Sequence, residues 1–254
     1  MIAGRSMSQI LGALKRREHY HAALQMFRIY RNPFDGFRRY LLGMGDYPSE
    51  IGLRSPIGPI KLRAYSHHDI LTINEIFCRE DYFASGTEDV FVDFGSNIGI
   101  SAAYFLTRSS RGFAYLFEPV PTNVMRLRNQ LAVLDRFSID EVAIATQDGM
   151  ARFGVEATGR YGGIGINTNE FIDVKCIDSN DVLRTVIAKH GKIDILKIDI
   201  EGLEGEVVTR IPQCLLQNIH TIYAEWAWPA NPIPNTHAYR QYGTVAQFSR
   251  TSSA

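Results

Sequence analysis

The sequence predicts an α/β fold in which a mostly parallel sheet carries helices on both of its faces. Two observations lead to this prediction. From residue 89 onward, short β-branched and aromatic runs alternate with segments of helical periodicity, and parallel strands need such crossovers between them. The composition, with 45% hydrophobic and 21% charged residues in a chain of 254, also allows a large core.

The first part of the chain is predicted to form a helical and hairpin extension over residues 1–69, followed by the main domain at residues 70–254. Apolar residues recur at three- and four-residue steps over residues 7–31, which indicates a helix that Pro33 ends. The segment GLRSPIGPIKLRAY then indicates a short hairpin or an edge strand.

The stretch from Lys15 to Arg39 is locally basic. Three interpretations remain open: a solvated helix face, an arm that covers the active site or joins two subunits of a homo-oligomer, and a patch that contacts an anionic membrane surface. The whole chain carries 27 basic and 27 acidic residues, which argues against a dedicated nucleic-acid-binding protein. Cys78, Cys176 and Cys214 lack metal-ligand spacing and are expected to be reduced thiols of a cytoplasmic protein.

Five strands are expected in the main domain, and a helix follows each of the first four. In chain order the strands are VFVDFG, FAYLFEP, FSIDEVAIA, KIDILKIDI and HTIYAEW. The helices are IGISAAYFLTR, TNVMRLRNQLAVL with Thr122 or Asn123 as its N-cap, SNDVLRTVIAKHG closed by Gly191, and EGEVVTRI. After the third strand, MARFGVE and FIDVKCI flank a glycine-rich loop at residues 159–165, which is either a lip over a ligand pocket or a plain turn.

A glycine-rich turn follows the first strand, which ends at Asp93. Its candidate cofactor-binding residues are Gly95, Ser96, Asn97 and Gly99. Ligands of doubly wound sheets bind at the carboxyl ends of the strands, where glycines let a ligand approach the backbone. A dinucleotide prefers a further glycine where this chain has Asn97. The turn therefore favours a smaller group, such as the methionine part of S-adenosylmethionine, whose ammonium the Asp93 carboxylate could face directly or through water.

Glu118 ends the second strand, at the distance from the first glycine where such folds place an acid for ribose hydroxyls. A carboxylate there can accept hydrogen bonds from both hydroxyls and would repel a 2′-phosphate. The order of strand, glycine turn, helix, strand and acid therefore predicts a nucleoside-type cofactor. The alternatives are a purely structural turn and a solvated acid at a strand tip.

Four blocks, VDFGSNIGIS, FEPVPTN, VAIATQDGMARF and DILKIDIEGLEGEVV, resemble the successive blocks of the FkbM-type family of S-adenosylmethionine-dependent methyltransferases. The resemblance covers about residues 70–226 and implies a Rossmann-like class I methyltransferase sheet, with methyl transfer to a hydroxyl of a sugar or natural product. It places Asp93, Gly95, Asn97 and Gly99 on the cofactor turn, Glu118 on the ribose acid, and Glu141 near the adenine edge, where the family more often has asparagine.

The segment after Trp226 does not match the usual ending of such sheets, a helix and an antiparallel strand pair. A short helix is expected at residues 235–241 and a strand at residues 244–248. This pattern favours a shortened sheet or a truncated gene.

The fourth strand carries the candidate catalytic residues. Side chains alternate along a strand, so Lys197, Asp199 and Glu201 share one face. A lysine inside a parallel sheet is costly unless it is paired, and its candidate partners are Asp199 and, on the adjacent strand, Glu225.

Either carboxylate of the fourth strand, or a lysine whose pKa burial lowers, could orient the acceptor or take its proton. The alternatives are a buried ion pair for Lys197 and a helix cap for Glu201. The spacing of histidine, aspartate and glutamate predicts no metal site.

The sequence thus predicts an S-adenosylmethionine-dependent O-methyltransferase that acts on a small-molecule or glycan acceptor, a saccharide or a secondary metabolite. An NAD-dependent oxidoreductase is the first alternative, disfavoured by the missing middle glycine. A cofactor-binding protein with weakened catalysis is the second, suggested by the short C-terminal segment.

Overall fold

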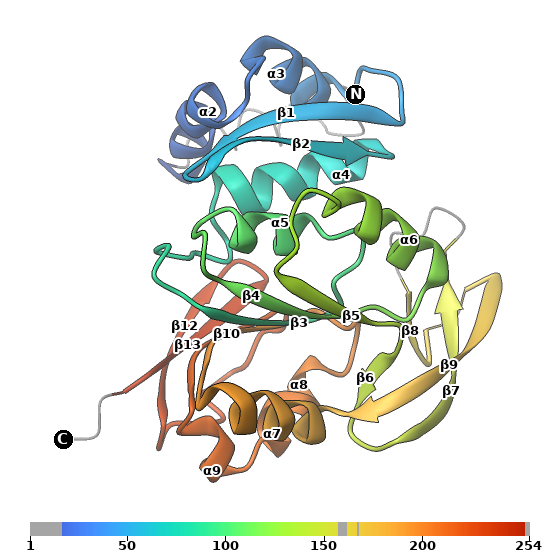
Figure 1. The fold of residues 1–254 in the computed structure, drawn as a ribbon, viewed down its shortest axis with the longest axis vertical. Coiled ribbons are helices and arrows are strands. Elements are labelled where there is room, and N and C mark those ends of the chain that lie inside the picture. Colours follow the sequence, from blue (N-terminus) through green and yellow to red (C-terminus); the bar gives the residue numbers. More distant parts are fainter. Residues whose placement is uncertain (1–16, 157–161, 167, 252–254) are drawn as a thin grey trace. The chain divides into compact units, whose positions relative to one another are not determined.

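The computed structural model describes residues 17–156, 162–166 and 168–251, and the chain forms two compact units, residues 1–85 and 86–254 (Figure 1). The domain boundary expected between residues 69 and 70 falls inside helix α4 (His67–Ile73) of the first unit. The two-domain assignment with that boundary stays a prediction. The two compact units divide between residues 85 and 86.

The first unit contains the expected hairpin, with helices before and after it. Its elements are α2 (Arg17–Ile29), α3 (Pro33–Leu42), β1 (Ser49–Ser55), β2 (Gly58–Ala64), α4 and a π-helix, η1 (Asn74–Cys78). Pro33 does not only end the first helix: it also begins α3, where its missing N–H costs nothing, and Asn32 caps that helix by accepting from the Asp35 N–H. The part of the predicted helix before Arg17 lies outside the described residues.

The second unit is built on a seven-stranded sheet in the order β12-β13-β11-β10-β3-β4-β5. Its strands are β3 (Val90–Phe94), β4 (Phe113–Phe117), β5 (Phe137–Asp140), β10 (Ile193–Ile198), β11 (Ile219–Ala224), β12 (His237–Tyr242) and β13 (Val245–Arg250). The five strands from β11 to β5 are parallel, and β13 and β12 add an antiparallel edge.

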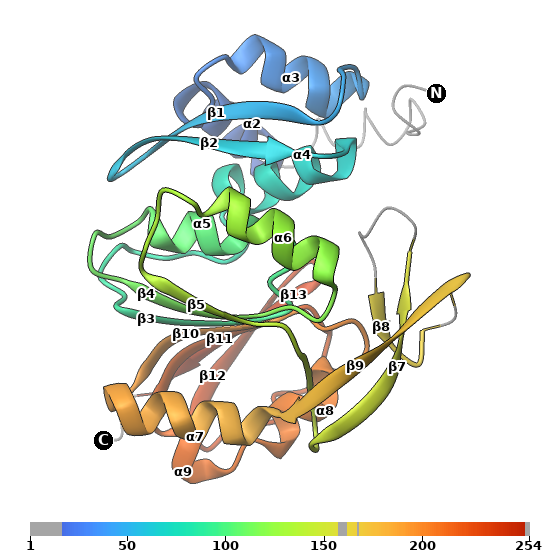
Figure 2. The same cartoon turned by 45° about the vertical axis from the view of Figure 1, so that its right-hand side comes forward.

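Helices cover both faces of this sheet (Figure 2). On one face lie α5 (Ile100–Leu106) and α6 (Pro121–Gln130); on the other lie α7 (Ser179–His190), α8 (Glu204–Arg210) and α9 (Gln213–Leu216). The central strands β3 and β10 are buried on both sides, as expected for parallel strands between helical layers. The predicted fold class is therefore confirmed.

Besides the strand FSIDEVAIA, which is described below, three expectations about the elements were wrong. Residues 235–241 do not form a helix, because His237–Tyr242 is strand β12. The sheet consequently ends in an antiparallel strand pair, and the expectation of a shortened sheet is not met. The N-cap of α6 is Val120 rather than Thr122 or Asn123, since Pro121 already occupies the first helical turn.

The segment between β5 and α7 forms a second, four-stranded sheet with the order β6-β9-β7-β8. The strands are β6 (Ala143–Ala145), β7 (Gly149–Val155), β8 (Gly162–Ile164) and β9 (Glu170–Asp178). The run FSIDEVAIA, expected as one strand, is thus divided between the two sheets. Within the described residues, no helix is long and apolar enough to cross a membrane.

Strand β8 meets the carboxyl edge of the main sheet at Gly163. A Cβ atom at Gly163 would lie 2.9 Å from the backbone oxygen of Glu201, so only glycine allows this approach. The glycine-rich loop expected at residues 159–165 therefore touches the site region with its described part, whereas residues 159–161, Tyr161 included, lie outside the described residues.

Candidate active site

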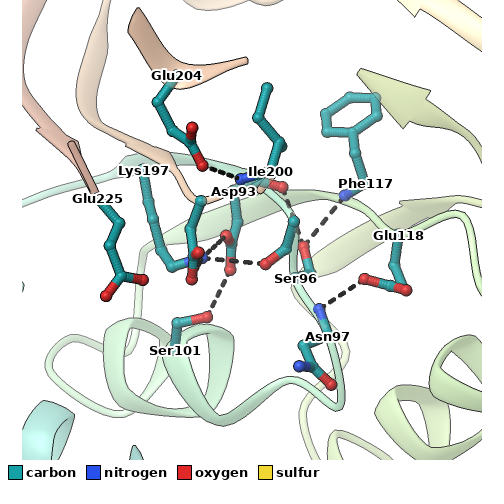
Figure 3. A network of polar contacts seen from close by, with 12 residues as sticks. Asp93, Ser96, Asn97, Ser101, Phe117, Glu118, Lys197, Ile200, Glu204 and Glu225 are labelled. Carbon is teal, nitrogen blue, oxygen red and sulfur yellow. Dashed lines mark hydrogen bonds and ion pairs between the residues drawn. The ribbon is translucent and has the colours of Figure 1, made fainter. Parts of the chain in front are cut away.

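The turn after β3 is held tightly against the ends of the neighbouring strands (Figure 3). The N–H groups of Gly95 and Ser96 both donate to the carbonyl oxygen of Phe117, at 3.1 and 3.0 Å. The Ser96 hydroxyl donates to the Asp93 carbonyl at 3.0 Å and accepts from the Phe117 N–H at 3.1 Å. Ser96 is buried, so it holds the turn in place and is not open to a ligand.

Gly95 is required by both its backbone conformation and its surroundings. Its φ angle is 83°, in the left-handed region. A Cβ atom would lie 1.8 Å from the carbonyl oxygen of Asp199, which is backbone and cannot move away. The turn after β3 and the end of β10 are therefore fixed against each other, and this brings two groups of predicted site residues together.

Glu118 joins the same turn from the end of β4. Its Oε2 accepts from the Asn97 N–H at 2.9 Å, and its Oε1 accepts from the Val120 N–H at 3.1 Å and the Asn123 side-chain amide at 3.2 Å. Asn97 itself has a φ of 49°, a conformation that asparagine tolerates better than most residues. Glu118 and the glycine turn are thus adjacent, as the sequence predicted for a cofactor site.

The pKa of the Glu118 carboxyl group lies close to neutral pH, so both of its protonation states are populated there. Burial raises its pKa to about 7, and its hydrogen bonds from Val120, Asn123 and Asn97 oppose that rise. A carboxylate can accept about four hydrogen bonds, and three are in use here. Further donors, such as a pair of vicinal hydroxyls, would favour the ionised form.

Lys197 lies buried in the centre of β10 and is paired, as expected from its position. Its ammonium donates to Asp93 Oδ1 and the Gly95 carbonyl at 3.0 Å each, and lies 3.2 Å from Asp199 Oδ2. Burial alone would lower the pKa of Lys197, but the charges of Asp199 and Asp93 raise it above its ordinary value. The idea that burial lowers the pKa of Lys197 enough to make it a base is therefore wrong.

Asp93 contacts protein groups on both of its oxygens. Oδ1 accepts from Lys197 and Oδ2 accepts from the Ser101 hydroxyl at 2.6 Å. The side chain is completely buried, and this burial raises its pKa while Lys197 opposes the rise. In this geometry Asp93 anchors Lys197, and it would reach a ligand ammonium only after a change of partners.

Asp199 and Glu225 form the solvent-facing side of the cluster. The Asp199 side chain is 28% exposed, whereas that of Lys197 is 3% exposed. Glu225 directly follows β11 and is exposed. Although the residue as a whole is exposed, the negative charge of Asp199 and the partial burial of the carboxyl group raise the pKa of Glu225 to about 8. Sequence analysis named Glu225 only as a partner of Lys197.

The other two predicted acids lie in different surroundings. Glu201 is half-buried just after β10 and has a φ of 54°, which is rare for glutamate. The loop there is held by Glu204, a buried residue that was missed: it accepts from the N–H groups of Ile200 and Gly202 at 3.0 and 2.9 Å. Glu141 is exposed in the segment between β5 and β6.

A cavity of about 520 Å³ opens two residues beyond Glu118. It is lined by Val120, Pro121, Thr122, Val155, Glu170, Phe171 and Ile172. The second sheet supplies the last four of these, and no local pattern in the sequence pointed to them. Among the residues that the structure describes, no group of three or more histidine, cysteine, aspartate or glutamate side chains could hold a metal ion.

The family model of the methyltransferase FkbM domain matches residues 93–240. The 2-O-methyltransferase NoeI of Sinorhizobium fredii (strain NBRC 101917 / NGR234) is 29% identical over 102 residues, which are 40% of this chain and 36% of that protein. The matched part of this chain thus spans little more than a third of that relative's length.

Two solved structures illustrate the similarity in shape. A methyltransferase from Geobacter sulfurreducens is 16% identical with a TM-score of 0.38, and the match covers 66% of this chain and 73% of that one. Methyltransferase FkbM from Methylobacillus flagellatus KT is 13% identical with a TM-score of 0.42, and the match covers 72% of this chain and 54% of that one.

Proposed function

Because this chain belongs to the methyltransferase FkbM family, we propose that it transfers the methyl group of S-adenosylmethionine to a hydroxyl oxygen. The acceptor is a saccharide or a secondary metabolite. The observation that carries this proposal is the pairing of Glu118 with the Asn97 N–H, because it sets an acid for ribose hydroxyls beside a tight glycine turn.

The chemistry of the site residues fits S-adenosylmethionine. Glu118 retains acceptor capacity, and hydroxyl donors would stabilise its charged form against the burial that raises its pKa. The cavity that begins at Val120 is largely apolar, which suits a flat base next to the ribose. The acidic edge formed by Asp199 and Glu225 suits a cationic sulfonium centre.

Methyl transfer from a sulfonium needs orientation more than activation. S-adenosylmethionine supplies an already activated methyl group. The chain supplies the rest: Glu118 accepts the ribose hydroxyls, the turn around Gly95 allows close approach of the backbone, and Asp199 faces the acceptor from the end of β10. Holding two reactants in line is worth up to ~7–11 kcal/mol of the barrier in favourable cases.

Transfer to oxygen is supported by the partial similarity to a protein named 2-O-methyltransferase. A hydroxyl acceptor must lose a proton, and Asp199 and Glu201 remain candidates for orienting it because both follow β10 at the carboxyl edge. Glu141 remains a candidate for the adenine edge. Each of these roles is a proposal.

The two alternative functions have lost their support. An NAD-dependent oxidoreductase disagrees with membership of a methyltransferase family. A catalytically weakened binding protein was suggested by a shortened sheet, whereas the sheet has its antiparallel pair β12 and β13.

We also propose partners for the first unit. Helices α2 and α3 expose Leu24, Phe27 and Phe34 next to the exposed Arg28 and Arg31. An apolar and basic surface of this kind suits an anionic membrane or a second copy of the chain. A nucleic-acid partner is not proposed, because the chain has no excess of basic residues.

Calorimetric titration tests the cofactor. We expect S-adenosylmethionine and S-adenosylhomocysteine to bind the wild-type protein, and Glu118→Ala to weaken both by at least about tenfold, because two charge-assisted hydrogen bonds are lost. Ser110→Ala, at an exposed position in the loop between α5 and β4, is the control and should bind as the wild type does. Folded protein that binds neither molecule would overturn the proposal.

A further inference from the structure

Two carboxyl groups lie side by side at the carboxyl edge of the main sheet. Strands β10 and β11 are parallel, with Ile198 opposite Ala224. Asp199 and Glu225 are the next residues of the two strands, and the Glu225 N–H donates to the Ile198 carbonyl at 3.0 Å. The backbone therefore fixes the two acids as neighbours.

The carboxyl groups of Asp199 and Glu225 are within hydrogen-bonding reach of each other. An ionised carboxylate can only accept hydrogen bonds, so a bond between two carboxyl groups requires one proton between them. The Thr244 hydroxyl donates to Glu225 Oε1 at 3.2 Å from the turn between β12 and β13.

The charges around the pair explain why it keeps a proton. Lys197 lies 3.2 Å from Asp199, but it also neutralises the buried Asp93 at 3.0 Å. One ammonium thus faces three carboxyl groups, and full ionisation would leave two negative charges in excess at this edge. The groups that act on Glu225 are Asp199 and Lys197 from β10 and Thr244 from the β12–β13 turn.

We propose that Asp199 and Glu225 form a carboxyl pair holding one proton, and that Glu225, once the pair is fully ionised, takes the proton of the acceptor hydroxyl. This inference rests on the proposed methyl transfer to oxygen. The acceptor O–H bond breaks and its proton goes to a Glu225 oxygen. The acceptor oxygen forms the new bond to the methyl carbon, and the electron pair of the broken carbon–sulfur bond stays on sulfur. Glu225 then returns its proton to water.

Titration of Glu225 tests the pair without any substrate. Protein labelled with carbon-13 at glutamate side-chain carboxyl carbons is followed by NMR, and the Glu225 signal is identified by its loss in Glu225→Gln. We expect a midpoint near pH 8, in agreement with the pKa of about 8, and a lower midpoint in Asp199→Asn, which removes the neighbouring charge. A midpoint in the ordinary glutamate range, near 4.3, would overturn the pair.

The dependence of the methylation rate on pH tests the proton transfer. With methyl glycopyranosides as acceptors, we expect kcat/KM to rise with pH and level off above about pH 8, as the Glu225 midpoint requires. Glu225→Gln should lose about 10²- to 10⁴-fold in kcat. Thr244→Val removes a hydrogen bond that favours the charged form, so it should move the midpoint to higher pH. An unchanged pH profile in Thr244→Val and Asp199→Asn contradicts the proposal.

The control separates this inference from the proposed function. Glu206→Gln changes an exposed glutamate of α8 that pairs with Arg210, and it should leave the pH profile and the rate unchanged. Glu225→Gln that binds S-adenosylhomocysteine normally and retains most of the wild-type kcat would overturn the role of Glu225 alone. Wild-type protein that binds neither cofactor nor acceptor would overturn the proposed function, while the NMR midpoint still decides whether the pair exists.

Discussion

The two ends of strand β10 each carry a buried or half-buried aspartate, and the two are held in opposite ways. At the amino end, the His220 ring lies 3.3 Å from Asp194. Asp194 accepts from three donors there: the Lys192 ammonium at 2.8 Å and the N–H groups of Asp89 and Val90 at 2.9 and 3.0 Å. Burial alone would raise the pKa of Asp194, but these donors lower it.

At the carboxyl end the balance is reversed. Lys197 faces Asp93, Asp199 and, one strand away, Glu225, and the pKa values of Asp93 and Glu225 are raised. Donors therefore outnumber carboxyl groups at the amino end of β10, whereas carboxyl groups outnumber the single ammonium at the carboxyl end, where the site is proposed. Carboxyl groups with raised pKa values are common at functional sites, where they lower the stability of the fold.

Replacing the lysine that pairs with the aspartate should lower the free energy of unfolding by very different amounts at the two ends of β10. Lys197→Met leaves the Asp93 carboxylate buried without its ion-pair partner, so we expect the free energy of unfolding to fall by ~3–5 kcal/mol. Lys192→Met removes a side chain that is 40% exposed, and we expect a loss of no more than ~1 kcal/mol. Urea denaturation measures both, and equal losses would contradict the comparison.

Glu118, at the carboxyl edge of the main sheet, should lower the free energy of unfolding as the pH rises. Glu118 has a pKa of about 7 when folded and 4.5 ordinarily, so the folded state binds more protons between these values. Stability from this group is therefore full below pH 4.5 and falls as the pH rises to about 7, by roughly 3 kcal/mol. Glu118→Gln should remove this fall, as urea denaturation at several pH values would reveal. Parallel curves for variant and wild type would argue against it.

At the amino end the pH dependence has the opposite sign. The pKa of Asp194 is lowered on folding, so its contribution is present above its ordinary value of 3.8 and is lost as the pH falls through the folded value. Asp194→Asn should cost about 1.5–3 kcal/mol at neutral pH and should lack this acid loss. Cofactor affinity, measured by calorimetry, should stay unchanged, because Asp194 lies at the end of β10 away from the turn. A weaker affinity would contradict the division of roles.

The smallest effect is expected at Glu141, which lies exposed outside the charged cluster. Glu141→Ala should change stability by no more than ~0.5 kcal/mol. If the proposed contact with the adenine edge is made, cofactor affinity should fall by about fivefold, the worth of one hydrogen bond. Thermal unfolding measures the change in stability, and calorimetry measures the change in cofactor affinity. An unchanged affinity would contradict the proposed contact of Glu141 with the cofactor.

Local patterns predicted what depends on local structure. The alternation of strand and helix gave the fold class, and the period of two along β10 correctly put Lys197 and Asp199 on one face. The glycine turn and Glu118 were adjacent because parallel strands end at the same edge. Glu204 was missed because its role depends on a loop whose shape no propensity describes.

The second sheet and strand β12 were not predicted, because the first depends on long-range pairing and the second has a weak pattern of apolar residues. The second sheet requires Ala143 to pair with Cys176, and no periodicity reveals such a contact. Strand β12 is an edge strand with four of its six residues exposed, so it lacks the apolar alternation by which strands are recognised. The cavity that begins at Val120 could not be predicted for the same reason, since four of its seven lining residues belong to the second sheet.

The contact at Gly163 has a consequence for how such enzymes can diversify. The backbone of β8 lies against the backbone that follows β10 there, so the contact requires a residue without a side chain at position 163. Residues of β7 and β9 that line neither this contact nor the cavity could then change without moving the end of β10. We expect a chimaera that exchanges the segment between β6 and α7 to keep the end of β10 in place only if a glycine stands at position 163.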